Sequence, residues 1–194
     1  MAKDYTFEKT GNAHNLAGNN PSKTVFDLNG HTFTLASGTS FLPYYTQTRS
    51  FTPSFTVKNG DMVMNGSANL FITQHGHPTN SKNGVVELFL EDLNITYASG
   101  ATGSVVTYFG GSTNGPSYVD ISVTNCNIDA SAAGKAKIFD FKDTKNNSNV
   151  NFVMKGGSIK GSTVENTPII TQNYPGDKIS FAPYNGNYTT VSYN

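Results

Sequence analysis

The chain has 194 residues, with 13 basic and 13 acidic side chains and a formal net charge of zero. Arg49 is the only arginine, and no basic stripe is present that would bind a phosphate backbone, so we expect no nucleic-acid partner. The length fits one domain, and no apolar segment is long enough to span a bilayer, so we also expect no membrane insertion.

The first part of the chain, residues 1–23, is polar and rich in Gly and Asn. It contains no apolar run of the kind found in a secretory signal, so we expect no signal peptide. The open end of a stacked fold must be covered, because its strand edges would otherwise pair with other chains. We therefore predict that residues 1–23 form an N-terminal cap or a docking arm, and that residues 24–194 form the folded domain.

A pattern of apolar residues then returns five times along the chain. Counted from the first residue of each repeat, positions 0, 2, 7 and 9 are occupied by large apolar side chains in eighteen of twenty cases. Position 4 is always Asn, Asp or Gly, which form turns readily. The repeats begin at Phe26, Phe55, Leu88, Ile121 and Phe152, and their position-4 residues are Gly30, Asn59, Asp92, Asn125 and Gly156.

This pattern predicts an all-β solenoid. Spacing by two places neighbouring apolar side chains on one face of a strand, and helical spacing is absent. Asn, Asp and Gly tolerate left-handed backbone angles, so the chain can turn a corner at position 4 while both strands keep facing inward. One repeat cannot bury its own inner face, but stacked repeats can. We predict a single-stranded parallel β-helix of five to six coils.

A third strand is expected between one repeat and the next, and apolar, β-prone segments stand at these places. Surface loops are expected at 75–84, 110–117 and 143–149, which are rich in Gly, Asn or Pro. The single cysteine, Cys126, lies beside a corner, and we interpret it as a small buried thiol. The third-strand candidates are Phe41–Tyr45, Leu70–Thr73, Val105–Phe109, Ile138–Phe141 and Ile169–Thr171, and Ile179 and Phe181 are candidates to begin a sixth coil.

The corners and paired strands resemble a known family. The sequences LNGHTFTL, VTNCNID and MKGGSIKG are similar to coils of the right-handed parallel β-helix in the pectate-lyase-like superfamily. That superfamily includes polysaccharide lyases and hydrolases, and the tailspikes of bacteriophages. The resemblance covers about residues 26–162 and implies a right-handed helix, but a fold does not specify a reaction. No catalytic motif of the family has a clear match here.

Polysaccharide cleavage needs two carboxyl groups on either side of the sugar, about 5 to 9.5 Å apart. Equivalent positions on adjacent coils would supply that spacing. Asp140 is the best single catalytic candidate, because it lies in a third-strand segment near Lys142 and Asp143. The alternative is a solvated strand charge paired with lysine. Asp92 is better interpreted as a corner residue.

Binding residues are predicted from the aromatic and amide side chains near the third strands. Tyr44, Tyr45, Gln74 and Tyr108 are the candidate glycan-binding residues, with the alternative that some of the tyrosines fill the core or pack between subunits. His75 and His77 flank a glycine, but no adjacent residue supplies the further ligand that a metal site needs. We expect no metal and no cofactor.

These observations leave three hypotheses for function. The first is a non-enzymatic bacteriophage virion protein, a capsid decoration or tail appendage on the virion surface. It would contact other virion proteins and bacterial surface polysaccharide, and it would associate as a homotrimer. The second is a small polysaccharide-degrading enzyme, a lyase or a glycoside hydrolase. The third is a carbohydrate-binding module of a longer tailspike.

Overall fold

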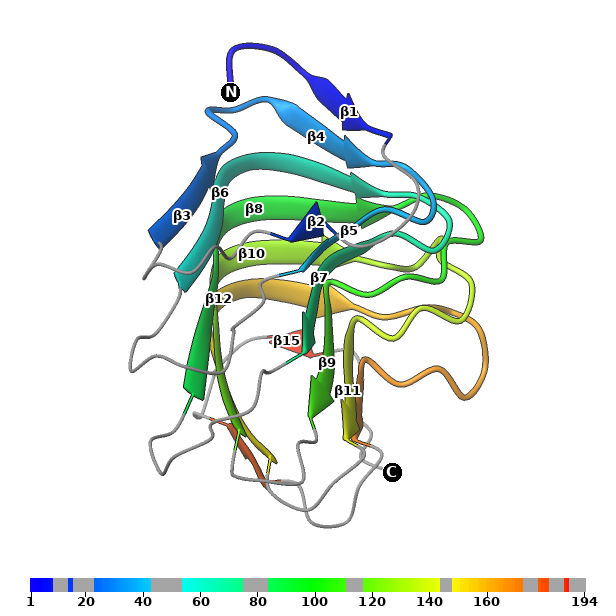
Figure 1. The fold of residues 1–194 in the computed structure, drawn as a ribbon. Coiled ribbons are helices and arrows are strands. Elements are labelled where there is room, and N and C mark those ends of the chain that lie inside the picture. The colour runs from blue at the N-terminus through cyan, green and yellow to red at the C-terminus, as the bar shows by residue number, and fades with distance from the viewer. Residues whose placement is uncertain are drawn as a thin grey trace.

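The computed structural model describes residues 1–8, 14–15, 23–42, 54–74, 84–110, 117–143, 148–172, 178–181 and 187–188 (Figure 1). Within these ranges the chain forms strands and turns, and no helix occurs. The strands are β1 Tyr5–Phe7, β2 His14–Asn15, β3 Lys23–Asp27, β4 Thr32–Leu35, β5 Ser40–Leu42, β6 Ser54–Met64, β7 Asn69–Gln74, β8 Gly84–Tyr97, β9 Val106–Gly110, β10 Ser117–Asp129, β11 Phe139–Asp143, β12 Ser148–Lys160, β13 Ile170–Gln172, β14 Lys178–Phe181 and β15 Asn187–Tyr188.

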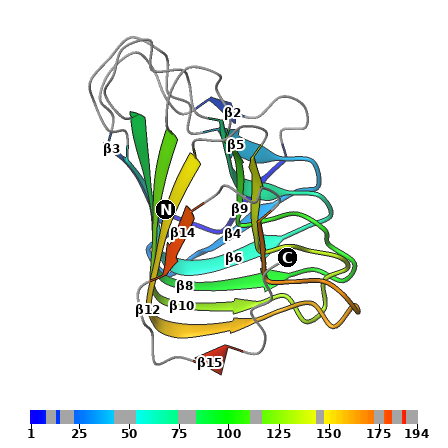
Figure 2. The ribbon, with the colours of Figure 1, turned by 90° about the horizontal axis from the view of Figure 1, so that it is seen from below.

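The strands form two sheets, and within each sheet all paired strands are parallel. The long-strand sheet has the order β1-β4-β6-β8-β10-β12-β14, with β3 paired to β6 and β15 paired to β12. The short-strand sheet has the order β13-β11-β9-β7-β5-β2. The chain visits the two sheets in alternation and advances one strand each time, as Figures 1 and 2 show. This arrangement is a parallel β-helix, as the repeat predicts.

The number of coils differs slightly from the prediction. About four turns are complete, each a long bent strand followed by a short one: β6 with β7, β8 with β9, β10 with β11, and β12 with β13. Five to six coils were expected. The first repeat is interrupted, because its strand breaks into β3 and β4. At the C-terminal end the described strands of the long-strand sheet are only the short β14 and β15.

The predicted inward positions form the core. Eighteen of the twenty residues at positions 0, 2, 7 and 9 are buried, and only Phe26 and Gly161 are half-buried. Leu88, Leu90 and Ile95 of β8 are fully buried. Burying one such side chain contributes about 1.5 to 3 kcal/mol, so each coil gains most of its stability from contact with its neighbours.

The corners have the expected backbone conformation. Asn59, Asp92 and Asn125 have φ values of 60°, 52° and 51°, and Gly156 has a φ of 73°. Left-handed angles cost a residue with a side chain about 1 to 2 kcal/mol. Part of that cost is offset here, because the Asn125 amide donates a hydrogen bond of 3.2 Å to the Asp92 carboxylate in the preceding coil.

The first coil departs from the predicted alignment. Phe26 pairs with Val57 rather than with Phe55, so the first corner contains two residues more than the second. The extra length places Leu28 against Gly60, where a Cβ atom would lie 2.6 Å from the Leu28 Cβ. Gly60 provides the space that Leu28 fills.

A further inward position, which the pattern did not include, lies directly after each corner. Leu93 and Cys126 occupy it and are buried, with exposed fractions of 1% and 0%. The buried thiol predicted at Cys126 is thereby confirmed, and burial raises its pKa to about 11. The next coil has Gly157 at this position, because a Cβ there would lie 1.9 Å from the Cys126 carbonyl oxygen.

The short strands lie where the third-strand segments were expected, and similar turns lead into them. The N–H groups of Thr39, Ala68, Ala101 and Ala133 each donate to the carbonyl oxygen three residues earlier, at 3.0 to 3.1 Å. At the N-terminal end, β1 pairs with β4, and the Met1 amino group donates to the Asp27 carbonyl oxygen at 2.5 Å. Residues 1–8 therefore cover part of the first coil.

Candidate functional site on the outer face of the long strands

The outer face of the long strands holds the described carboxylates that are best placed for chemistry. Glu87, Phe89 and Glu91 alternate along β8 with buried residues, so their side chains point outward. Asp120 of β10 pairs in register with Glu87. Glu87, Phe89 and Asp120 are half-buried. An aromatic ring with two carboxylates on neighbouring strands therefore lies on this face.

These carboxylates are not engaged elsewhere in the described structure. No hydrogen bond or ion pair of a described residue includes the side chain of Glu87, Glu91 or Asp120. Parallel strands lie about 4.8 Å apart, so the Glu87 and Asp120 backbones have that separation. Carboxyl groups about 5 to 5.5 Å apart suit a retaining glycosidase, and an aromatic ring suits the apolar face of a sugar.

Other acidic residues on the outer faces are part of structural ladders. In one ladder, the Ser158 hydroxyl donates to Asn127 at 3.1 Å, Asn127 donates to Asn94 at 3.2 Å, and Asn94 donates to Asp61 at 2.9 Å. The four residues stand in register on successive long strands. Asp61 is therefore the terminal acceptor of a chain of amide and hydroxyl donors.

Two further carboxylates are stabilised in their charged form. The Asn59 amide and the Asn29 N–H lower the pKa of Asp27, and Lys58 at 3.6 Å adds to this effect. The Ser131 hydroxyl and N–H lower the pKa of Asp129 in the same way. Both carboxylates therefore hold turns and corners in place.

Asp140, the catalytic candidate from the sequence, lies in the short-strand sheet, on β11. Its side chain is 5% exposed. The Thr171 hydroxyl of the neighbouring strand donates to its Oδ1 at 2.6 Å, and the Lys137 ammonium lies 4.0 Å away. Thr107 pairs with it from the other side and is also buried. The surroundings of Asp140 are those of a paired interior carboxylate, and its catalytic role stays a prediction.

The structure places the predicted glycan-binding residues in different positions. Tyr108 lies in the core with an exposed fraction of 1%, as the alternative interpretation of the aromatic residues expected. Gln74 is described for its backbone only, at the end of β7, in register with Phe109. Tyr44 and Tyr45 lie outside the described residues. The described chain therefore brings no two of these four side chains together.

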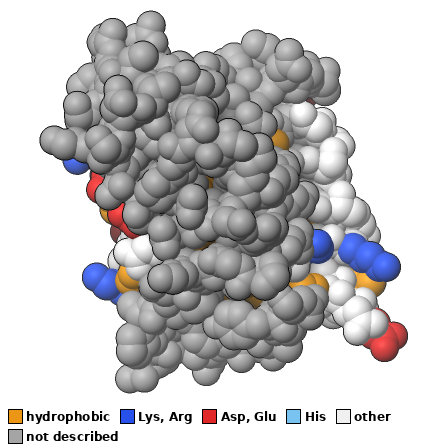
Figure 3. All heavy atoms as spheres, turned by 60° about the horizontal axis from the view of Figure 1, so that its bottom comes forward, with side chains coloured by type: hydrophobic (Ala, Val, Ile, Leu, Met, Phe, Trp, Pro, Cys, Tyr) orange, Lys and Arg blue, Asp and Glu red, His pale blue; other side chains and the backbone are white. Residues whose placement is uncertain are grey.

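No metal site is found in the part of the chain that the structure describes. No group of three or more His, Cys, Asp or Glu side chains there could bind a metal ion. His75 and His77 lie outside the described residues. In Figure 3, the charged side chains of that view form small groups on two sides and no continuous patch of one sign. No helix long and apolar enough to span a membrane occurs among the described residues.

Comparison with known proteins gives no relative. No family model, no curated protein and no solved structure matches this chain.

The residues of this candidate site were not selected from the sequence. None of Glu87, Phe89, Glu91 and Asp120 is among the catalytic or binding residues predicted from the sequence. Outward positions of a strand follow from the same alternation that predicts the core. A search of positions −1, 1 and 3 of each repeat for aromatic and acidic neighbours would have found Phe89 between Glu87 and Glu91, and Asp120 at the position equivalent to Glu87.

Proposed function

We propose that this chain is a non-enzymatic bacteriophage virion surface protein, a capsid decoration or tail appendage that contacts other virion proteins. The observation that supports this proposal most strongly is that four of its carboxylates make hydrogen bonds that stabilise the fold. Asp27, Asp61 and Asp129 stabilise corners and ladders, and Asp140 is buried against Thr171. A rigid parallel β-helix in which these four carboxylates stabilise its own structure suits a scaffold better than a catalyst.

The resemblance of the repeats to phage tailspike coils supports the virion location. The outer face has one regular row of exposed polar side chains, Asp61, Asn94 and Asn127, and such donors and acceptors suit a hydrated bacterial polysaccharide. Phe89 supplies one aromatic ring for the same contact. In this proposal the homotrimer places three β-helices side by side, and residues 1–23 contact the particle.

The test is to separate virions from the lysate of a phage-infected culture in which the chain is expressed. The protein should co-sediment with virions in a density gradient, and antibodies against it should label the particle surface in electron micrographs. A chain found only in the soluble fraction of the lysate would contradict the proposal. Deleting residues 1–22 removes β1 and its pairing with β4, so it should lower the melting temperature as well as reduce incorporation into particles. Incorporation should be reduced even at temperatures at which the variant is still folded.

The second candidate function is a small polysaccharide-degrading enzyme, favoured by the unpaired carboxylates Glu87 and Asp120 beside Phe89. Incubation with bacterial capsular polysaccharide, assayed for new reducing ends or unsaturated uronate, separates it from the first. Turnover that Glu87→Gln and Asp120→Asn abolish, but that the exposed control Glu165→Gln preserves, would establish the enzyme. Turnover that Asp140→Asn abolishes would instead assign catalysis to Asp140.

A further inference from the structure

The N-terminal end of the β-helix is only partly covered. The strand β1 lies along β4, and the Met1 amino group reaches Asp27, so the corner and the second half of the first coil are capped. The strand β3 pairs with β6 on one side and has no described partner on the other (Figure 1). Val25, at its centre, is 47% exposed.

The free edge of β3 presents unpaired backbone groups. The Leu28 N–H donates to the Lys58 carbonyl oxygen of β6 at 2.8 Å. Because backbone groups alternate in direction along an extended chain, those of Lys23, Val25 and Asp27 point away from β6. The Asp27 carbonyl oxygen fits this assignment, since it accepts from Met1. Among the described residues, the Val25 N–H and carbonyl therefore have no partner strand, and they are in position to pair with another strand.

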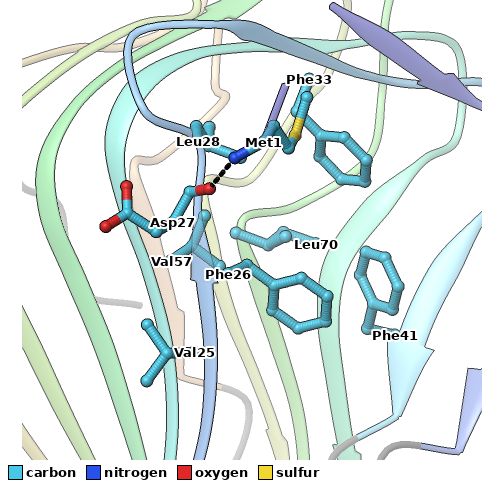
Figure 4. A pocket seen from close by; sticks show the side chains of 9 residues that line it. All are labelled: Met1, Val25, Phe26, Asp27, Leu28, Phe33, Phe41, Val57 and Leu70. Atoms are coloured by element: carbon cyan, nitrogen blue, oxygen red, sulfur yellow. Dashed lines mark hydrogen bonds between the residues drawn. The ribbon is translucent and has the colours of Figure 1, made fainter. Parts of the chain in front are cut away.

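An apolar pocket of about 190 Å³ lies beside this edge (Figure 4). Figure 4 shows the Phe26 ring turned toward Phe41 and Leu70, while the Val25 side chain points away from them. Phe26 is only half-buried, although it occupies an inward position. The core of the first coil is therefore incompletely covered where β3 has no neighbour.

The sequence of β3, KTVFD, is complementary to itself in the antiparallel direction. If two copies pair about Val25, the Val25 residues lie opposite one another, and each Lys23 lies opposite the Asp27 of the other copy. Lys23, Val25 and Asp27 are all on the exposed face of β3. Opposite charges facing one another stabilise such a pair, whereas a parallel arrangement in register would place like charges together. Thr24 then faces Phe26 of the other copy on the inner side.

We propose that the free edge of β3 is an interface for a second copy of this chain, and that two β-helices join end to end by antiparallel pairing of β3. The two long-strand sheets become continuous through this contact, and the pocket beside Phe26 is closed by the other copy. A two-fold contact of this kind is self-limiting, because the same surface is used on both copies. Side-by-side association, including the expected homotrimer, leaves these ends free. Docking of residues 1–23 on a particle would use the same end of the β-helix, so the end-to-end pair is proposed for the free chain, which the tests below use.

A cysteine substitution at the centre of the pair tests this geometry. Val25→Cys in the full chain places two thiols opposite one another, at a Cα separation of about 5.5 Å that a disulfide spans. Cys126, the single natural cysteine, is 0% exposed and gives little background. Under mild oxidation Val25→Cys should form a disulfide-linked pair in most molecules. The control Thr96→Cys, exposed on another part of the face, should not.

A proline substitution tests the same contact without oxidation. Val25→Pro removes an N–H that bonds nothing in β6, and proline is tolerated on edge strands at such positions. The mass of the Val25→Pro variant in solution, measured by light scattering, should be half that of the natural chain. The variant should still melt cooperatively. Equal masses, or a Val25→Cys yield no higher than that of Thr96→Cys, would overturn the proposal and leave the edge for a different partner.

Discussion

Asn125 and Asp92 stand at the same corner of neighbouring coils, joined by a hydrogen bond of 3.2 Å from the Asn125 amide to the Asp92 carboxylate. Both have left-handed backbone angles, with φ of 51° and 52°. The residues that permit the corner are thus also the residues that connect one corner to the next. The Asn59 amide also donates to the preceding coil, at 3.2 Å, but its acceptor is the carboxylate of Asp27, the last residue of β3 rather than a left-handed corner residue.

This relationship predicts different effects for two substitutions of one residue. Asn125→Ala loses the hydrogen bond and still has a Cβ at the left-handed angle, so its unfolding free energy should fall by about 1 kcal/mol. Asn125→Gly also loses the bond but adopts the angle without strain, so it should be the more stable variant. Urea denaturation measures both. An alanine variant as stable as the glycine variant would show that the backbone angle contributes nothing at this corner.

Two glycines illustrate the two reasons for which the fold needs glycine, which are a left-handed backbone angle and a lack of space for a Cβ atom. Gly30 has a φ of 78° and open space where a Cβ would lie, so Gly30→Ala should cost only about 1 to 2 kcal/mol. Gly103 has no positive φ, but a Cβ there would lie 1.7 Å from the Ala68 carbonyl oxygen. Gly103→Ala should therefore be more destabilising, by several kcal/mol or with loss of soluble protein. Thermal melts of both variants measure this difference. If Gly30→Ala melted at a lower temperature than Gly103→Ala, the roles assigned to the two glycines would be wrong.

The fold is predictable from the sequence because two independent constraints coincide in each repeat. Alternating apolar residues define the inner face, and Asn, Asp or Gly allows the corner. At Phe26 these constraints give the wrong alignment: they place Phe26 opposite Phe55 and Leu28 opposite Val57, whereas Phe26 pairs with Val57 in the structure. The structure resolves the shift through Gly60, which leaves room for Leu28. A periodic pattern alone cannot detect that contact.

The candidate site is less predictable, for a physical reason. Alternation indicates which side chains point outward, but not whether an outward side chain is exposed. Asp140 and Thr107 point outward from the short strands and are nevertheless buried. Phe89 and Glu87 point outward from β8 and are partly exposed. That difference depends on the whole fold around each strand.

A charged side chain placed in the core should destabilise the fold severely. Leu90 has an exposed fraction of 0% and lies between Val57 and Val123 of the adjacent coils. Leu90→Asp places an unpaired carboxylate there, so we expect a loss of about 4 kcal/mol or more, close to the whole stability of a typical domain. The control Ser99→Asp lies in an exposed turn and should melt close to the natural chain. Similar melting temperatures for both variants would place Leu90 outside the core.

The last prediction concerns the pH dependence of stability at Asp129. Hydrogen bonds from the Ser131 hydroxyl and N–H lower its pKa, and Lys160 at 3.6 Å contributes further. A carboxyl whose pKa is lower in the folded than in the unfolded state adds stability above its ordinary pKa of 3.8, and this is lost as the pH falls through the folded value. The Asp129 side chain is 49% exposed, so the contribution should stay below about 1 kcal/mol.

Asp129→Asn removes the charge and keeps an oxygen that accepts from Ser131. The natural chain should therefore be more stable than this variant at about pH 7, and the difference should shrink as the pH falls below 3.8. Ser131→Ala removes one of the two hydrogen-bond donors to Asp129. In that variant the pH-dependent part of the stability that Asp129 contributes should be smaller but still present. Denaturation curves at a series of pH values measure each difference. A gap between the natural chain and Asp129→Asn that stays constant down to about pH 2 would show that Asp129 is not stabilised in its charged form.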